Sequence, residues 1–317
     1  MFTNIFNNCN EKFYLNNLLN NYKFYCTYID PNLESSRDFS MNHLNTYISS
    51  SMSLIPFQNG YIANQRFVNY TYNKHSCKIV KKSKAFTTLN RCIFMNDDFD
   101  VISSNFFETP IDNDVINGIE DIRLYLHNNQ LLFNGTSYKN NNISIGIGKY
   151  DPGANMLTND HFLASPFDNN IEKNWIYLTD AENSLCMIYK WFPIMIGKPN
   201  LNSLEIIKEI KSPNLFKYVR GSSNAVKIDN EVWFLCHIVS PDKTYYHIFV
   251  ILNQSCTQIK RYTLPFKFTK HKIEYAIGFC SKNSNIILSY SIWDETTYLI
   301  SIEKKTLLDK LNWIEKP

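Results

Sequence analysis

The 317-residue sequence contains only 9 glycines and has a nearly balanced charge, with a net value of +3. No stretch approaches the roughly 18 apolar residues that span a membrane. Neither a glycine-rich phosphate loop nor a His-Glu-x-x-His zinc motif is present, and the first ten residues show no basic-then-apolar signal pattern. These absences argue against a membrane protein, a P-loop enzyme and a zinc peptidase. We therefore expect a cytoplasmic protein.

The cysteines and lysines also show no binding pattern. None of the eight cysteines lies within four residues of another, so there is no Cys-x-x-Cys metal or redox site. In a cytoplasmic chain we expect them to be free and mostly buried. The densest basic run, 78–84, holds four lysines and favours a solvated strand edge over a nucleic-acid surface. We predict no resident metal, no nucleic acid and no membrane partner.

The residues that are abundant indicate strands. Tyr and Phe are common, and both suit β-structure. The excess of Asn, Lys, Ile, Tyr and Phe is typical of an A+T-rich genome, such as that of a giant virus, in which case the protein acts in host cytoplasm or the virion. Five polar turns recur at spacings of about 53, 53, 48 and 54 residues, close to the period of a four-stranded propeller blade. The turns centre near His75, Asn128, Ala181, Asp229 and Asn283.

A polar cluster precedes each turn by seven to nine residues. The clusters are Arg66 with Asn69, Glu120-Asp121-Arg123, Lys173-Asn174, Arg220 and Glu274. If each cluster opens the inner strand of a blade, all five surround one axial pocket. A β-sandwich, the alternative fold, gives no reason for charge at the same phase of every repeat.

We therefore predict an all-β fold, a five-bladed β-propeller over residues 56–317 preceded by an N-terminal helical extension over 1–55. The apolar pattern over 11–22 predicts an amphipathic helix, and 40–51 is a candidate for a second. Residues 304–313 are predicted to form a short closing helix. The oligomeric state is left open.

The tetrapeptide Glu120-Asp-Ile-Arg123 is the sharpest local signal. In a regular strand, Glu120 and Ile122 point one way while Asp121 and Arg123 point the other. A pocket-facing Asp121 beside another carboxylate could hold a proton and act as a general acid. The alternative is an Asp–Arg pair that seals a strand end.

Four cations are candidates for binding an anion. Arg66, Lys173, Arg220 and Lys190 would repel one another in one pocket unless a phosphate or a sugar-nucleotide diphosphate lies between them. The alternative is that each pairs with a carboxylate such as Glu120, Asp121, Glu274 or Asp294. His237 ends an apolar strand and could be a core histidine, and Asp294 could be a turn residue.

Taken in order, these clusters resemble the five-bladed propeller of the β-mannoside phosphorylases, glycoside hydrolase family 130, and their mannosyltransferase relatives. The resemblance is closer still to uncharacterised propellers of bacterial and giant-virus sugar-transfer proteins. It covers roughly residues 60–302, and it rests on an ordered set of short motifs. These are Arg66-Phe-Val-Asn-Tyr70, Glu120-Asp-Ile-Arg123, Lys173-Asn-Trp175, Arg220-Gly-Ser-Ser223, His237 and Asp294.

The resemblance implies roles for these residues. In that family the Asp of a Glu-Asp-Pro-Arg motif is the general acid, which implies that Asp121 is catalytic. It also implies that Arg66, His237 and Asp294 contact sugar. Phosphate or further sugar hydroxyls would bind Lys173, Lys190 and Arg220. We further expect Asn69, Glu120, Arg123 and Glu274 to contact substrate. Ile122 replaces the proline of the family motif, and Gly-Ser stands in place of Gly-Gly after Arg220, which bears on mannose specificity.

We therefore expect an inverting glycosyl-transfer enzyme, either a glycoside phosphorylase, a glycosidase or a glycosyltransferase, acting on a glycan or sugar phosphate. No organic cofactor is predicted, since inorganic phosphate or a sugar nucleotide would be a co-substrate. The alternative is a non-catalytic propeller that binds glycan or protein, because the fold alone does not decide function. A catalytic protein should place Asp121, Arg66 and Arg220 around one cavity.

Overall fold

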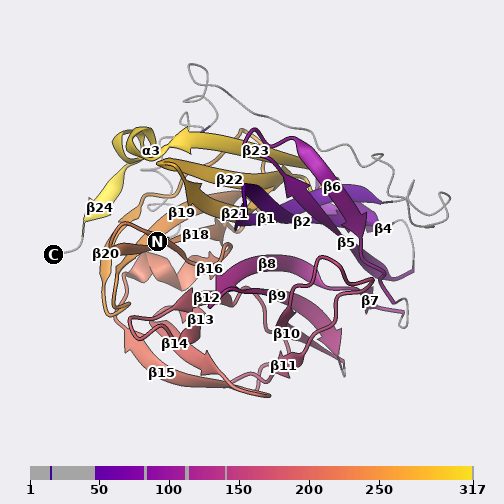
Figure 1. The fold of residues 1–317 in the computed structure, drawn as a ribbon, viewed down its shortest axis with the longest axis horizontal. Helices are drawn as coiled ribbons and strands as arrows, with labels where there is room; N and C mark the ends of the chain where they lie inside the picture. The colour runs from indigo at the N-terminus through magenta and orange to yellow at the C-terminus, as the bar shows by residue number, and fades with distance from the viewer. Residues whose placement is uncertain (1–14, 16–46, 82–83, 111–113, 140, 316–317) are drawn as a thin grey trace.

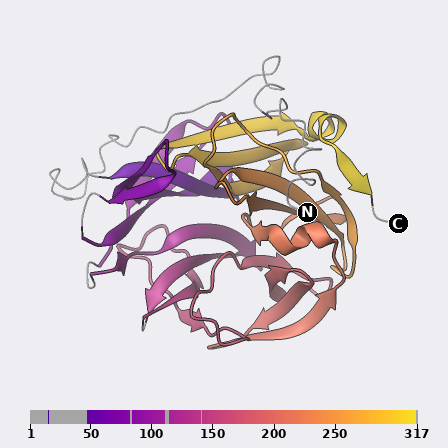
Figure 2. The same cartoon turned by 180° about the vertical axis from the view of Figure 1, so that it is seen from behind.

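The computed structural model describes residues 15, 47–81, 84–110, 114–139 and 141–315. Five antiparallel sheets surround a central axis, so the predicted all-β five-bladed propeller is confirmed (Figure 1). Seen from behind, the sheets form the same closed ring (Figure 2). No helix among the described residues is long and apolar enough to cross a membrane.

The first blade carries an insertion. Its strands, in order from the axis outward, are β1 (Ile48–Phe57), β2 (Gly60–Val68), β5 (Phe86–Met95) and β6 (Val101–Phe106), with β7 (Ile116–Asn117) parallel to β5. Between β2 and β5 the chain forms a separate two-stranded hairpin of β3 (Tyr70–Asn73) and β4 (Lys78–Lys81).

The next two blades are regular four-stranded sheets. The second contains β8 (Glu120–His127), β9 (Gln130–Lys139), β10 (Asn142–Lys149) and β11 (His161–Leu163). The third contains β12 (Ile176–Thr179), β13 (Leu185–Trp191), β14 (Ile194–Pro199) and β15 (Leu204–Ile210).

The last two blades depart from the four-stranded pattern. A 3₁₀ turn, η3 (Asn214–Tyr218), leads into the fourth blade, whose inner edge is split between β16 (Val219–Gly221) and β17 (Val226–Ile228). The sheet continues with β18 (Glu231–Val239), β19 (Tyr245–Asn253), β20 (Ile259–Thr263) and β24 (Trp313–Glu315). The fifth blade has β21 (Glu274–Lys282), β22 (Asn285–Ile292) and β23 (Thr296–Glu303), followed by α3 (Lys304–Lys310). The predicted closing helix is thus α3, which ends at Lys310, before β24.

Four of the five predicted turns join the first two strands of a blade. The prediction for the first turn, near His75, is wrong. The turn at His75 is the tip of the β3–β4 hairpin, whereas residues 58–59 join β1 to β2. The inserted hairpin adds residues to the first blade and so shifts the apparent repeat. The predicted boundary after residue 55 falls within β1, and 48–51 are strand, not helix. The helix predicted over 11–22 lies outside the described residues except for Leu15, which is helical and buried.

The core lies between neighbouring blades. Trp233 of the fourth blade belongs to the same buried cluster as Phe279 of the fifth, and Met52 of the first blade packs in a cluster with Ile287 of the fifth. Inner-strand side chains are therefore fixed by the blades beside them. The six described cysteines are free and buried, as predicted, while Cys9 and Cys26 lie outside the described residues.

Polar contacts close the ring between the fifth and first blades. The Ser50 hydroxyl donates to Asp294 Oδ1 at 2.9 Å, and Gln65 Nε2 donates to Thr297 Oγ1 at 3.2 Å. The blades also approach closely at Gly278, where an added Cβ would lie 2.6 Å from a carbonyl oxygen of β1. These contacts hold the first and second strands of the first blade against the fifth blade.

Candidate functional site

A cavity of about 290 Å³ opens at one mouth of the propeller axis and receives side chains from all five blades. Seven predicted site residues line it, namely Arg66, Glu120, Asp121, Lys173, Arg220, His237 and Asp294. The predicted convergence of distant clusters on one pocket is therefore confirmed for these seven.

A bulge at the start of β8 brings two carboxylates into the cavity. Glu120 pairs with Thr136 of β9, but Arg123 pairs with Asn134, so β8 contains one extra residue between these pairs. Asp121 adopts a φ of 53°, a conformation that aspartate tolerates better than most residues. The predicted alternation is wrong here, since Glu120 and Asp121 point to the same side.

Arg66 binds both carboxylates. Its Nη1 lies 2.8 Å from Asp121 Oδ1, and its Nη2 lies 3.2 Å from Glu120 Oε1. Arg66 lies near the end of β2, not on an inner strand as expected, and its side chain reaches the start of β8 in the neighbouring blade. A buried guanidinium that donates to two carboxylates forms strong, directional hydrogen bonds and fixes their orientation.

Asp294 belongs to the same network. Arg66 Nη2 donates to the Tyr70 hydroxyl at 3.2 Å, and that hydroxyl donates to Asp294 Oδ2 at 2.9 Å. Ser50 and Ser291 donate to the other oxygen, at 2.9 and 3.4 Å. Asp294 lies between β22 and β23, so it is a turn residue that also faces the cavity.

Burial shifts the proton affinity of one carboxylate in this cluster. The pKa of Glu120 is raised above its usual value by burial and by the neighbouring Asp121, although the Arg66 charge acts in the opposite direction. At a given pH Glu120 is therefore more often protonated than a free glutamate.

Lys173 and Arg220 form a cationic side of the cavity. Lys173 precedes β12 and Arg220 is on β16, and both side chains are exposed. Within the described part of the chain, neither makes an ion pair with a carboxylate, whereas Arg66 is paired twice. Of the four candidate cations, only Arg66 therefore has a carboxylate partner among the described residues, and Lys173 and Arg220 line the cavity without one.

His237 faces the cavity as a neutral ring. Its Nδ1 lies 2.8 Å from the Ser222 hydroxyl, and its ring stacks on Tyr245 and contacts Tyr275 edge-on, with centroid distances of 5.9 and 5.1 Å. Burial, with the nearby Arg220 cation, holds the pKa of His237 well below its usual range. The ring is therefore a hydrogen-bonding group at neutral pH, not a cation.

Arg123 does not line the first cavity, and its guanidinium joins the blades around the axis. Its guanidinium donates to the Asp121 carbonyl at 2.9 Å, to Asn174 Oδ1 at 3.3 Å and to the Tyr275 hydroxyl at 2.9 Å. Its Nε donates to the Ser222 carbonyl. One side chain of the second blade thus contacts the third, fourth and fifth blades and also holds the backbone of Asp121.

Three further predicted residues lie elsewhere. The Asn69 side chain bonds the backbone at Ala85 and Thr87. Glu274 has no exposed surface and accepts backbone hydrogen bonds beneath β21. Lys190 lies on β13 with its ammonium 4.8 Å from the Phe167 ring centre, away from the cavity. None of the three lines the first cavity.

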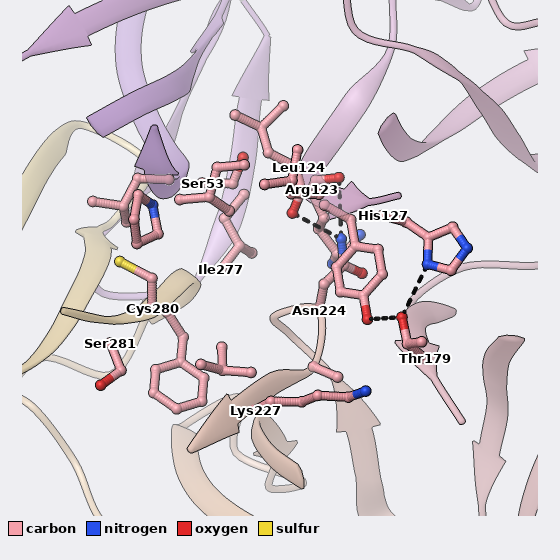
Figure 3. A pocket seen from close by; sticks show the side chains of 18 of the residues that line it. Ser53, Arg123, Leu124, His127, Thr179, Asn224, Lys227, Ile277, Cys280 and Ser281 are labelled. Atoms are coloured by element: carbon pink, nitrogen blue, oxygen red, sulfur yellow. Dashed lines mark hydrogen bonds between the residues drawn. The ribbon is translucent and has the colours of Figure 1, made fainter. Parts of the chain in front are cut away.

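A second cavity, of about 380 Å³, occupies the opposite end of the axis (Figure 3). It is lined by residues 123–127 of β8 and by Asn128 of the following turn, whereas the first cavity is lined by the start of that strand. Asn224 lies between the inner strands here and donates to the carbonyls of Arg123 and Leu124 at 3.2 and 3.1 Å, while His127 contacts Thr179 (Figure 3). The predicted acid Asp121 and the exposed cations Lys173 and Arg220 lie at the first end, whereas Arg123 and Lys227 line the second cavity. Among the described residues, no group of three or more ligand-type side chains is arranged for a metal.

Sequence reasoning missed the aromatic side chains of the site. Tyr70, Tyr72, Phe86, Tyr245 and Tyr275 all line the first cavity. Tyr70 follows Arg66 by four residues and belongs to the same motif, so the sequence could have indicated it as a site residue. The others are ordinary strand residues in sequence and carry no signal of their own.

Comparisons with known proteins support the fold. No protein-family model and no curated protein matches the sequence. Among solved structures, β-1,2-mannobiose phosphorylase from Listeria innocua has a TM-score of 0.60 at 11% identity, covering 91% of this chain and 99% of its own. A structure from the GH130 family of mannoside phosphorylases scores 0.57 at 10% identity, covering 81% and 85%.

A third neighbour is MPT-4, a mannose phosphorylase from Leishmania mexicana in complex with phosphate. It has a TM-score of 0.51 at 14% identity and covers 83% of this chain and 86% of its own. At such identities the likeness shows the fold alone. The propeller of this chain is thus built like those of the mannoside phosphorylases, as the sequence resemblance implied.

Proposed function

We propose that this protein is a carbohydrate-active enzyme that transfers a glycosyl group with inversion, using phosphate as its co-substrate. The observation that carries the proposal is the division of one cavity into two sides. Two carboxylates held by Arg66 lie on one side, and the exposed Lys173 and Arg220, which have no carboxylate partner within the described residues, lie on the other. Glycosyl transfer to phosphate needs an acid and an anion site on opposite faces of the sugar.

The two sides have complementary roles in the reaction. Asp121 donates a proton to the departing glycosidic oxygen, directly or through a sugar hydroxyl, as the bond from that oxygen to the anomeric carbon breaks. A phosphate oxygen held by Lys173 and Arg220 forms the new bond from the opposite face. The products are a sugar 1-phosphate of inverted configuration and a free hydroxyl on the leaving sugar.

Phosphorolysis is favoured over hydrolysis by the state of the remaining carboxylates. An inverting hydrolase needs a second carboxylate to activate water. Glu120 is held beside Asp121 by the same Arg66, so it lies on the acid side and not on the opposite face. Glu274 lies outside the cavity, and both oxygens of Asp294 already accept hydrogen bonds from hydroxyl groups. Phosphate is an anion at neutral pH and needs no such base.

The cavity volume favours inorganic phosphate over a sugar nucleotide. About 290 Å³ is close to the lower end, roughly 300 Å³, of the range for small-molecule sites. A sugar and a phosphate ion fit this range better than a sugar bearing a diphosphate and a nucleoside. Transfer from a sugar nucleotide is therefore the less favoured form of the proposal.

The test is the variant Asp121→Asn, assayed for sugar 1-phosphate formation from a panel of β-linked disaccharides and phosphate. Loss of a general acid should lower kcat by about 10²–10⁴-fold, while disaccharide binding persists. Asp168→Asn is a matched control, because Asp168 is exposed and also has a positive φ, 52°.

Full turnover by Asp121→Asn would refute the acid role. A wild-type protein that binds a disaccharide but never cleaves it, with or without phosphate, would instead identify a glycan-binding propeller.

A further inference from the structure

The second cavity, at the end of the axis opposite the candidate active site, is built by the inner strands of all five blades. β1, β8 and β21 line it, together with Thr179 at the end of β12 and residues 224–227 around β17. Its volume of about 380 Å³ lies within the range of small-molecule sites, roughly 300–1,000 Å³. Among the described residues, none lines both cavities. The second cavity is therefore a separate candidate binding site that the proposed glycosyl transfer does not use.

Apolar side chains form one part of its wall. Leu126, Val226 and Phe279 line the cavity from the second, fourth and fifth blades, and Ile55 lines it from the first. Leu126 is 47% exposed, although it lies on an inner strand. A ligand that covers these side chains removes apolar surface from water, which favours binding. The wall therefore fits a ligand with an apolar body.

The charged side chains of this cavity are cations. Arg123 and Lys227 line it, and none of the described lining residues is an aspartate or a glutamate. The Arg123 guanidinium is engaged toward the first cavity, where it donates to the Asp121 carbonyl and the Tyr275 hydroxyl. Lys227 is exposed and forms no ion pair within the described part of the chain. The electrostatics of the cavity therefore favour an anion, and Lys227 is the side chain free to bind it.

The carboxylates that flank this rim in sequence are engaged elsewhere. Asp229, two residues after Lys227, pairs with Lys304. Asp180, next to Thr179, accepts two backbone N–H groups of its own turn with Oδ1, at 3.0 and 2.8 Å. Neither is therefore positioned to neutralise Lys227 within the folded chain.

The polar side chains of the cavity bond to one another. Thr179 Oγ1 lies 2.8 Å from the Tyr125 hydroxyl and 3.2 Å from His127 Nδ1, and His127 Nε2 lies 3.1 Å from Asn128 Nδ2. In Figure 3 the ammonium of Lys227 is directed toward the side of the cavity that holds Thr179 and His127. These groups are ordered before a ligand arrives, so binding beside them costs little ordering of the chain.

We propose that the second cavity binds a small organic anion, whose single anionic group pairs with Lys227 and whose apolar body covers Leu126, Val226 and Phe279. Burial of apolar area supplies affinity. An ammonium group without a competing carboxylate selects the sign of the ligand's charge. A neutral sugar has no charge for Lys227 to bind, so this ligand differs in kind from that of the first cavity.

The chain offers a matched control for the charge. Lys227→Glu reverses the charge at an exposed position of β17 that lines the cavity. Lys149→Glu makes the same change at an exposed position of β10, the third strand of its blade, which does not line the cavity. Both positions are exposed, so neither substitution should unfold the protein.

The experiment is calorimetric titration of wild type, Lys227→Glu and Lys149→Glu with octanoate, hexanoate and octylamine. Wild type should bind octanoate roughly tenfold more tightly than hexanoate, because two further CH₂ groups are buried. It should also bind octanoate about tenfold more tightly than octylamine, which has the same chain and the opposite charge. Lys227→Glu should reverse this preference between octanoate and octylamine, and Lys149→Glu should match wild type.

Wild type that binds neither acid, or that binds octanoate no better than octylamine, would overturn the proposal. So would wild-type affinity for octanoate in Lys227→Glu, because the acid would then be bound elsewhere, for example between Lys173 and Arg220. None of these results bears on glycosyl transfer, because both variants leave every residue of the first cavity in place.

Discussion

Replacing Glu274 with glutamine should remove a pH dependence from the stability of this propeller. Glu274 has no exposed surface. Its Oε1 accepts the Phe268 N–H at 2.6 Å, and its Oε2 accepts the N–H and hydroxyl of Thr269 at 2.9 and 2.8 Å. Burial raises the pKa of Glu274 from 4.5 to about 7, although these hydrogen bonds favour the ionised form.

The direction follows from proton binding in the two states. Between about pH 4.5 and 7 the unfolded chain loses this proton while the folded chain keeps it, so the free energy of unfolding falls as pH rises. The stabilisation is fully present below about pH 4.5 and is lost as pH passes the folded pKa of about 7. A pKa difference of about 2.5, at about 1.4 kcal/mol for each pKa unit, gives about 3 kcal/mol.

Buried histidines contribute the opposite slope. Burial lowers the pKa of His247 to about 3, and its Nδ1 lies 3.8 Å from Glu274 Oε1. A histidine in the unfolded chain binds a proton near pH 6, whereas the buried His247 does not. The free energy of unfolding therefore rises with pH because of this group. The comparison between wild type and Glu274→Gln, not the wild-type curve alone, therefore isolates Glu274.

The assay is urea unfolding followed by tryptophan fluorescence between pH 4.5 and 8. At pH 4.5 the Glu274→Gln variant should be less stable, by about 1–3 kcal/mol, because the glutamine amide cannot satisfy every donor around it. Wild type should lose about 3 kcal/mol relative to the variant by pH 8, so the deficit should disappear or reverse. Glu209→Gln, at an exposed position of β15, should track wild type throughout. Parallel curves for wild type and Glu274→Gln across this range would refute the reasoning.

The remaining predictions concern the cations. Lys173→Ala should raise the KM for phosphate about tenfold or more, because it removes a cation from the proposed anion site. Lys190→Ala, in which the removed ammonium lies over Phe167, should leave that KM unchanged, and equal effects of both would argue against the site. Arg123→Lys should lower the free energy of unfolding by about 2–4 kcal/mol, because one ammonium cannot reach acceptors on four blades. Denaturant unfolding checks this, and a wild-type midpoint would contradict the role of Arg123 in joining the blades.

The strand order was predictable because its signals are local. Residues 123–126 and 131–133 form adjoining strands with an asparagine turn between them, as their alternation and turn residues predicted. The same holds at the turns near Ala181, Asp229 and Asn283. The turn prediction was wrong in the first blade because its inserted hairpin contains a turn signal as strong as that between two blade strands.

Four of the seven residues that meet in the cavity were predictable from their phase in the repeat, because they lie at or next to the start of an inner strand, namely Glu120, Asp121, Lys173 and Arg220. Arg66, His237 and Asp294 lie at other points of their blades, and their place in the pocket was implied by the family resemblance. Phase fixes which end of a strand a residue occupies, and that end faces the mouth of the axis. It does not fix the direction of a side chain. Glu274 begins its inner strand as predicted, yet its carboxylate is enclosed by the chain at Phe268 and Thr269.

Sequence by itself determined the fold class, the number of blades and the end of the axis at which charge collects, because each depends on short-range pattern and its recurrence. Tertiary structure alone decided which charges pair. The bulge that turns Glu120 and Asp121 together toward Arg66 depends on the register of β8 against β9. The hydrogen bonds of Arg123 depend on three other blades lying within reach of its side chain. Both follow from contacts between residues far apart in the chain, which local pattern does not encode.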